Sequence, residues 1–146
     1  MPQHHESVLE DEICKYLAAH GWLYSPDDTG YDRDLALFPE DVFAWLSETQ
    51  SADFEKRIKP SDSTEAQDKA EAALLQRLTK ALTADLKADG GTLAVLRRGF
   101  SDFNASFAMC QFKPNSGLNA TTAAKYQSVR LRVMRQVHYS KANTNK

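Results

Sequence analysis

The spacing of apolar residues predicts helices through the first part of the chain. Residues 7–20 place apolar side chains at four-residue intervals from Leu9 to Leu17, which is the spacing of one helix face. Ser7 has the position of an N-cap, and Gly21 suits the left-handed residue that ends a helix. We therefore predict an opening helix that uses its apolar stripe for packing.

Two further helices are predicted before residue 90, and Phe54 and Ile58 either continue the first of these or form a short helix of their own. Pro39 suits a first helical position, so a helix is expected to begin there. A longer helix is expected over residues 64–86, because its leucines recur on one side. This leucine face, which requires a partner surface, consists of Leu74, Leu75, Leu78 and Leu82.

The pattern changes to that of strands after residue 100. Residues 107–112 are apolar on both faces, as in a buried strand. Residues 129–139 alternate apolar and polar side chains, with an irregularity near Met134 that indicates a bulge. The expected fold class is α/β, of the α+β kind, with helices in the first two thirds and then a few strands. The expected organisation is one domain or part of one, helical over 1–100 and strand-containing over 101–146.

Composition places the chain among globular proteins without a membrane span. Hydrophobic residues make up 42% and charged residues 26%. The longest apolar run is residues 42–46, far below the roughly 20 residues that cross a bilayer. The start lacks the basic and apolar regions of a signal peptide. A cytoplasmic location and no membrane partner are therefore expected.

The net charge of −2 conceals a strong asymmetry. Residues 1–96 contain 19 acidic side chains and 9 Lys or Arg, whereas residues 97–146 contain 9 Lys or Arg and the single acid Asp102. Such a division is typical of nucleic-acid contact through the basic part. Pairing between the two parts inside the protein explains it equally well, and both explanations stay open here.

The best candidate for DNA contact is the basic face of the expected strand at 129–139. Side chains two residues apart, as in Arg130 and Arg132, point to the same face and can follow a phosphate backbone. A solvated or salt-bridged face remains an alternative. The candidate DNA-binding residues are Arg130, Arg132, Arg135, Lys125, Arg97 and Arg98.

No catalytic site is expected within residues 1–146. The phosphate-binding pattern GxxxxGK[ST] does not occur, so no ATP site is expected. Metal-dependent phosphodiester hydrolysis requires clustered carboxylates, and Asp102 is the only acid after residue 96. Glu10 and its acidic neighbours in the opening helix could contribute to a metal site, although favourable interaction with the helix dipole explains them as well.

Four blocks in order resemble the N-terminal region of the restriction (R) subunit of type I restriction-modification enzymes. The resemblance covers nearly the whole chain. The blocks are ESVLEDEI at 6–13 with Leu17, Gly21 and Trp22; GTL at 91–93 with VLRRGF at 95–100; CQFKP at 110–114; and VRLRV at 129–133 with RQVHYS at 135–140.

This resemblance implies an ATP-dependent DNA translocase and endonuclease that cleaves unmodified foreign DNA. Its nuclease domain is of the PD-(D/E)xK type, it uses Mg²⁺ and ATP, and it works with modification and specificity subunits. The family's catalytic Asp and Glu-x-Lys follow the segment that matches 139–146, so the expectation is a non-catalytic N-terminal part at the edge of a restriction-endonuclease-like sheet. The resemblance also implies that Glu10 is an additional metal ligand.

Two alternatives from other classes stay open. One is a small stand-alone module that binds DNA through the basic 97–146 face, or a protein through its leucine face. The other is a purely structural subunit. No cofactor is expected in this chain itself under any of these interpretations.

Overall fold

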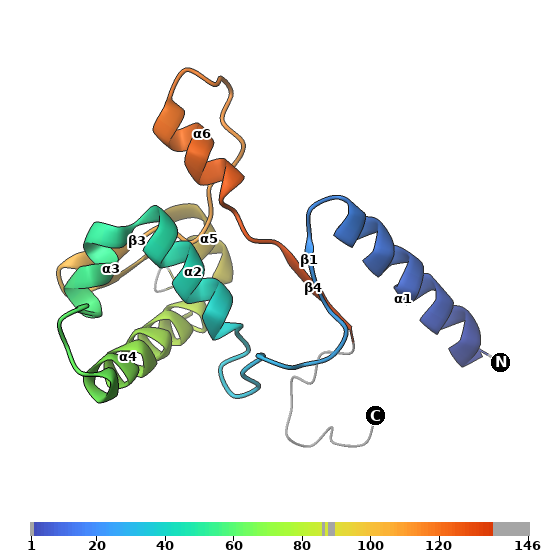
Figure 1. Cartoon of the computed structure of the whole chain (residues 1–146), viewed down its shortest axis with the longest axis horizontal. Coiled ribbons are helices and arrows are strands. Elements are labelled where there is room, and N and C mark those ends of the chain that lie inside the picture. Colours follow the sequence, from blue (N-terminus) through green and yellow to red (C-terminus); the bar gives the residue numbers. More distant parts are fainter. Residues whose placement is uncertain (1, 86, 88–89, 136–146) are drawn as a thin grey trace. The chain divides into compact units, whose positions relative to one another are not determined.

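The computed structural model of the chain divides into two compact units (Figure 1). Residues 2–85, 87 and 90–135 are described. Unit 1 combines Met1–Phe38 with Arg130–Lys146, and unit 2 is Pro39–Val129. The described residues form six helices and two small sheets of two strands each, which confirms a mixed α+β class. No helix among them is both long enough and apolar enough to cross a membrane.

Unit 1 contains one helix and a parallel pair of strands. Helix α1 (Pro2–Ala19) ends where Gly21 adopts a positive φ of 91°, as the sequence predicts. Strand β1 (Leu23–Ser25) follows and pairs in parallel with β4 (Arg132–Met134), as Figure 1 shows. The segments before and after unit 2 are thus joined in one sheet.

Three details of unit 1 differ from the sequence predictions. Helix α1 starts at Pro2, which suits a first helical position, so Ser7 lies inside the helix and is not its cap. Its apolar stripe is largely exposed at Leu9 and Ile13. Strand β4 begins at Arg132 and not at residue 129, because the partner β1 is only three residues long. The rest of the predicted strand, 136–139, lies outside the described residues.

Unit 2 contains five helices and a short antiparallel hairpin among its described residues. Strands β2 (Phe100–Asp102) and β3 (Ala105–Phe107) pair antiparallel. The helices are α2 (Pro39–Thr49), α3 (Ser51–Arg57), α4 (Thr64–Leu82), α5 (Thr92–Arg98) and α6 (Ala120–Gln127). The buried apolar side chains of unit 2, from helices and hairpin together, are Val42, Trp45, Leu46, Ile58, Leu74, Leu75, Leu78, Val95, Phe100, Ala105 and Phe107.

The predicted starts of two helices are confirmed in unit 2, although α4 ends at Leu82 and not at residue 86. Helix α2 begins at Pro39, and α4 begins at Thr64 after Ser63, whose hydroxyl accepts a hydrogen bond from the Ala66 amide at 3.2 Å. Three of the four leucines in the predicted face are buried. The partner surface that the leucine face requires is supplied within unit 2, where α4 contacts α5 and β2.

The predicted strand at 107–112 is replaced by an earlier and shorter one, β3. Beyond Phe107, the backbone of Ala108 is paired with side chains and not with another strand. Gln50 accepts from the Ala108 amide at 2.6 Å and donates to its carbonyl at 2.9 Å. The Trp45 indole donates to the same carbonyl at 2.7 Å. These contacts satisfy the backbone groups that a longer strand would have satisfied.

Gly99 allows the hairpin to pack closely against the end of α5. Its φ is 73°, and a Cβ at this position would overlap the carbonyl oxygen of Phe107. Only glycine combines this backbone conformation with so close an approach. Gly99 therefore sets the path of the chain from α5 into β2.

Candidate nucleic-acid interface

Arg132, a predicted DNA contact, interacts with Ser25 and Phe38 within unit 1. Its Nη1 donates to the Ser25 hydroxyl at 2.8 Å, and its guanidinium carbon lies 4.9 Å from the centre of the Phe38 ring. Ser25 is itself buried. Parallel register explains the first contact, because Arg132 is opposite Leu23 and Ser25 is two residues further on the same face.

Arg135 is paired with two carboxylates of α1. Its Nη2 lies 3.0 Å from Glu10 Oε2, and its Nη1 donates to Asp11. A hydrogen bond to Glu10 is the largest cause that raises the pKa of the Arg135 guanidinium above its ordinary value, and a hydrogen bond to Tyr24 is the second. For this arginine the geometry is that of the salt-bridged alternative, in which the basic and acidic parts of the sequence pair with each other.

Glu10, the metal ligand that the resemblance implies, accepts hydrogen bonds from the Arg135 guanidinium. Among the described residues, no group of three or more His, Cys, Asp or Glu side chains is arranged to hold a metal ion. A guanidinium competes with a cation for the same carboxylate oxygens. The described residues around Glu10 therefore do not fit Mg²⁺, and no chemical step is assigned to them.

The other predicted DNA-binding residues are dispersed. Arg130 is half-buried and precedes β4 in unit 1. Lys125 lies in the last turn of α6, whereas Arg97 and Arg98 occupy the last turn of α5, where cations interact favourably with the helix dipole. The six candidate residues thus lie on or beside three different elements, α5, α6 and β4.

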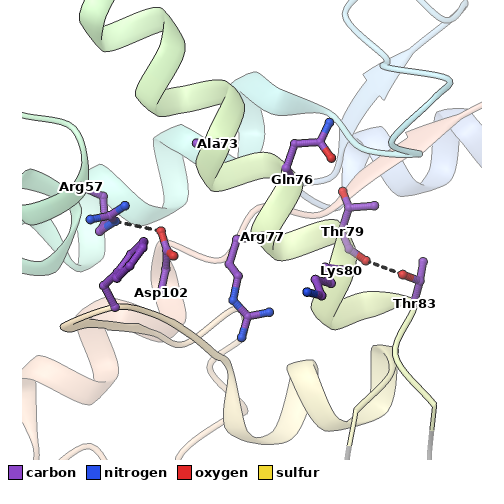
Figure 2. A pocket seen from close by; sticks show the side chains of 9 residues that line it. Arg57, Ala73, Gln76, Arg77, Thr79, Lys80, Thr83 and Asp102 are labelled. Atoms are coloured by element: carbon purple, nitrogen blue, oxygen red, sulfur yellow. Dashed lines mark hydrogen bonds and ion pairs between the residues drawn. The ribbon is translucent and has the colours of Figure 1, made fainter.

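A different set of cations meets in an open depression of unit 2, drawn in Figure 2. Its volume is about 590 Å³. Arg57 comes from the end of α3, Arg77 and Lys80 come from α4, and the β2–β3 hairpin supplies Asp102 and Phe103. The remaining lining residues are Ala73, Gln76, Thr79 and Thr83.

Helical spacing explains why α4 contributes two cations to this depression. Arg77 and Lys80 are three residues apart, so they lie on the same side of the helix, one turn above the other. Thr79 also lines the depression, and its hydroxyl oxygen is buried without a hydrogen-bond partner among the described residues. This side of α4 is polar because the opposite side carries the buried leucines.

Asp102 is neutralised by Arg57 at the edge of the depression. Arg57 Nε donates to Asp102 Oδ2 at 2.8 Å, and the aspartate is buried (Figure 2). No carboxylate of the described residues forms a salt bridge with Arg77 or Lys80. Because Asp102 is the only acidic side chain in the lining, the depression has an excess of positive charge.

A second depression, of about 270 Å³, shares two cations with the first. Arg77 and Lys80 line both depressions, and Arg98 of α5 joins them in the second one. We call the surface formed by Arg57, Arg77, Lys80 and Arg98 the basic groove. It can attract a polyanion, since two depressions that share Arg77 and Lys80 are lined by four cations in all.

Sequence reasoning identified only Arg98 of these four residues. Arg57, Arg77 and Lys80 belong to the acidic part of the chain, so the balance of charge along the sequence hides them. The spacing of Arg77 and Lys80 opposite the leucine face was a detectable signal. Their proximity to Arg57 and Arg98 depends on tertiary packing and leaves no local pattern.

Comparisons with known proteins identify no relative of this chain. A scan against protein-family models finds no match. Searches of curated proteins and of solved structures find no match either.

Proposed function

We propose that the chain binds the phosphate backbone of DNA through the basic groove. The observation that carries this proposal is the placement of Arg77 and Lys80 on one side of α4, without a carboxylate partner among the described residues. Cations that track a phosphate backbone gain affinity by releasing the counterions condensed on the nucleic acid. Such contacts are indifferent to base sequence.

We further propose that this binding serves the N-terminal part of a type I restriction enzyme R subunit. The support is the order of the four blocks that resemble that subunit, from residues 6–13 to 135–140. The proposed parent is cytoplasmic, cleaves unmodified DNA using Mg²⁺ and ATP, and acts with modification and specificity subunits. In this proposal, β1 and β4 form the edge of a restriction-endonuclease-like sheet.

A stand-alone DNA-binding module is the second candidate. The observation that favours it is that unit 2 carries both the basic groove and a buried apolar core of its own. Under either proposal, residues 1–146 alone do not cleave DNA. Nicking of a plasmid by the purified chain with Mg²⁺, abolished by Glu10→Ala, would contradict this expectation.

The experiment is a titration of a fluorescein-labelled DNA duplex followed by anisotropy over a salt series. Each phosphate contact adds roughly 0.9 to the steepness of log affinity against log salt. The double variant Arg77→Ala/Lys80→Ala should therefore flatten the slope by about 2.

The matched control is Lys59→Ala/Lys69→Ala, which removes the same charge from exposed positions of unit 2 outside the basic groove. Its slope should stay close to that of the unmodified chain. Equal flattening in both double variants would mean that general charge, and not the basic groove, causes binding.

A further inference from the structure

The tip of the β2–β3 hairpin carries a phenylalanine in an unusual position. Phe103 and Asn104 form the two-residue loop between the paired residues Asp102 and Ala105. Phe103 has a φ of 52°, and 88% of its surface is exposed. Glycine is the residue that hairpins of this kind favour where φ is positive, and a bulky side chain rarely adopts that conformation. Neither burial nor turn geometry therefore explains the ring.

Arg57 restrains the Phe103 ring on one side. The guanidinium carbon lies 4.6 Å from the ring centre, and the same guanidinium is anchored to the buried Asp102. Asp102 also immediately precedes Phe103 in the hairpin. The ring is thus kept at the rim of a depression that Arg77 and Lys80 line.

This combination of groups suits a ligand with both a flat ring and a phosphate. An exposed aromatic face stacks on a nucleobase regardless of its identity, and cations beside it bind the phosphates of the same strand. A duplex offers its phosphates but keeps the faces of its bases stacked on each other. An unpaired strand offers both.

We propose that Phe103 is a stacking platform for an unpaired base, so that the basic groove binds single-stranded nucleic acid in preference to duplex. This inference rests on the proposed function, because it assigns the phosphates of that strand to Arg77 and Lys80. Arg57 acts as a positioning residue, since it holds the ring and is itself held by Asp102.

The decisive variant is Phe103→Gly, which removes the ring and suits the positive φ of the turn. Binding of a fluorescein-labelled oligothymidylate should weaken roughly 5- to 100-fold, as expected for the loss of one base–aromatic stack. Phe103→Trp keeps a stacking surface and should retain the affinity. Thermal unfolding followed by circular dichroism verifies that each variant is folded.

An abasic strand of the same length separates this inference from the proposed function. It keeps the phosphates and lacks the bases, so Phe103→Gly should not change its affinity, whereas Arg77→Ala/Lys80→Ala should weaken it. If Phe103→Gly binds oligothymidylate as tightly as the unmodified chain, the stacking inference is wrong and phosphate binding stands. If the double variant binds the abasic strand unchanged, the proposed function fails, and the stacking inference fails with it.

Discussion

Eleven buried apolar side chains lie in unit 2, whereas Cys14 is the only one among the described residues of unit 1. In unit 1, strands β1 and β4 are instead held together by a parallel pairing of three residues each. Ion pairs of Arg135 with Glu10 and Asp11 connect α1 to the end of β4. Apolar burial is not weakened by ionic screening, whereas ion pairs at partly exposed positions are screened by salt. The two units should therefore respond differently to core truncation, salt and pH.

The largest effect is expected from truncating the core of unit 2. Leu46 is 0% exposed, so Leu46→Ala removes buried methyl groups and leaves a cavity. The free energy of unfolding of unit 2 should fall by about 2–5 kcal/mol. Urea denaturation followed by the fluorescence of Trp45, in a Trp22→Phe background, measures it.

Leu118→Ala provides the matched control for this truncation. Leu118 also belongs to unit 2, but 94% of its surface is exposed. The control should change the free energy of unfolding by less than about 0.5 kcal/mol. Similar losses for Leu46→Ala and Leu118→Ala would show that the apolar core does not dominate the stability of unit 2.

A smaller and more local effect is expected from Arg135→Ala in unit 1. This change leaves Glu10 and Asp11 without their guanidinium partner, so α1 should separate more often from the strand pair. The amide of Leu23, which donates to the Leu131 carbonyl at 2.8 Å, should exchange its hydrogen several-fold faster. Amides of α4 should exchange as before.

High salt should act on the unmodified chain in the same direction as Arg135→Ala, because it screens the same pairing. Lys15→Ala is the control, since Lys15 is an exposed cation on α1. If neither salt nor Arg135→Ala changes hydrogen exchange at the Leu23 amide, the ion pairs of Arg135 do not stabilise unit 1.

The smallest effect concerns Asp27 in the turn that follows β1. Hydrogen bonds from the Thr29 side chain and then from its backbone amide lower the pKa of this carboxyl below its ordinary value of 3.8. Because the folded pKa is lowered, the stabilising contribution is present above the unfolded pKa and is lost as pH falls through the folded pKa. The affected range is therefore acidic, below about pH 4.

Titration of Asp27 by NMR checks this expectation. Thr29→Ala removes the side-chain hydrogen bond and keeps the amide, which donates to Asp27 Oδ1 at 2.9 Å. The pKa of Asp27 should then move back toward its ordinary value. An unchanged pKa in Thr29→Ala would assign the shift to the backbone amide alone.

Local patterns were sufficient for several helices. The start of α2 at Pro39, the burial of most of the leucine face of α4 and the left-handed stop at Gly21 all depend on residues close together in the sequence. Helix formation and capping are governed by neighbours within a few positions. These features could therefore be predicted without knowledge of the tertiary structure.

Features that depend on distant residues could not be predicted in this way. The end of β3 is decided by Gln50, which lies 58 positions from Ala108. The partners of Arg135 lie 124 and 125 positions away, so its charge alone could not distinguish DNA contact from internal pairing. The basic groove combines α3, α4 and α5, and only tertiary packing brings them together.

The interruption of unit 1 by unit 2 has a consequence for synthesis on the ribosome. Arg132 and Ser25 are 107 positions apart, so at about 5–20 residues per second β4 is made roughly 5–20 seconds after β1. During that interval unit 2 can fold, because its residues are contiguous, while α1 and β1 have no strand partner. Slower or paused translation between residues 39 and 129 lengthens the time during which β1 has no strand partner. A chaperone that acts on the growing chain would therefore bind to α1 and β1.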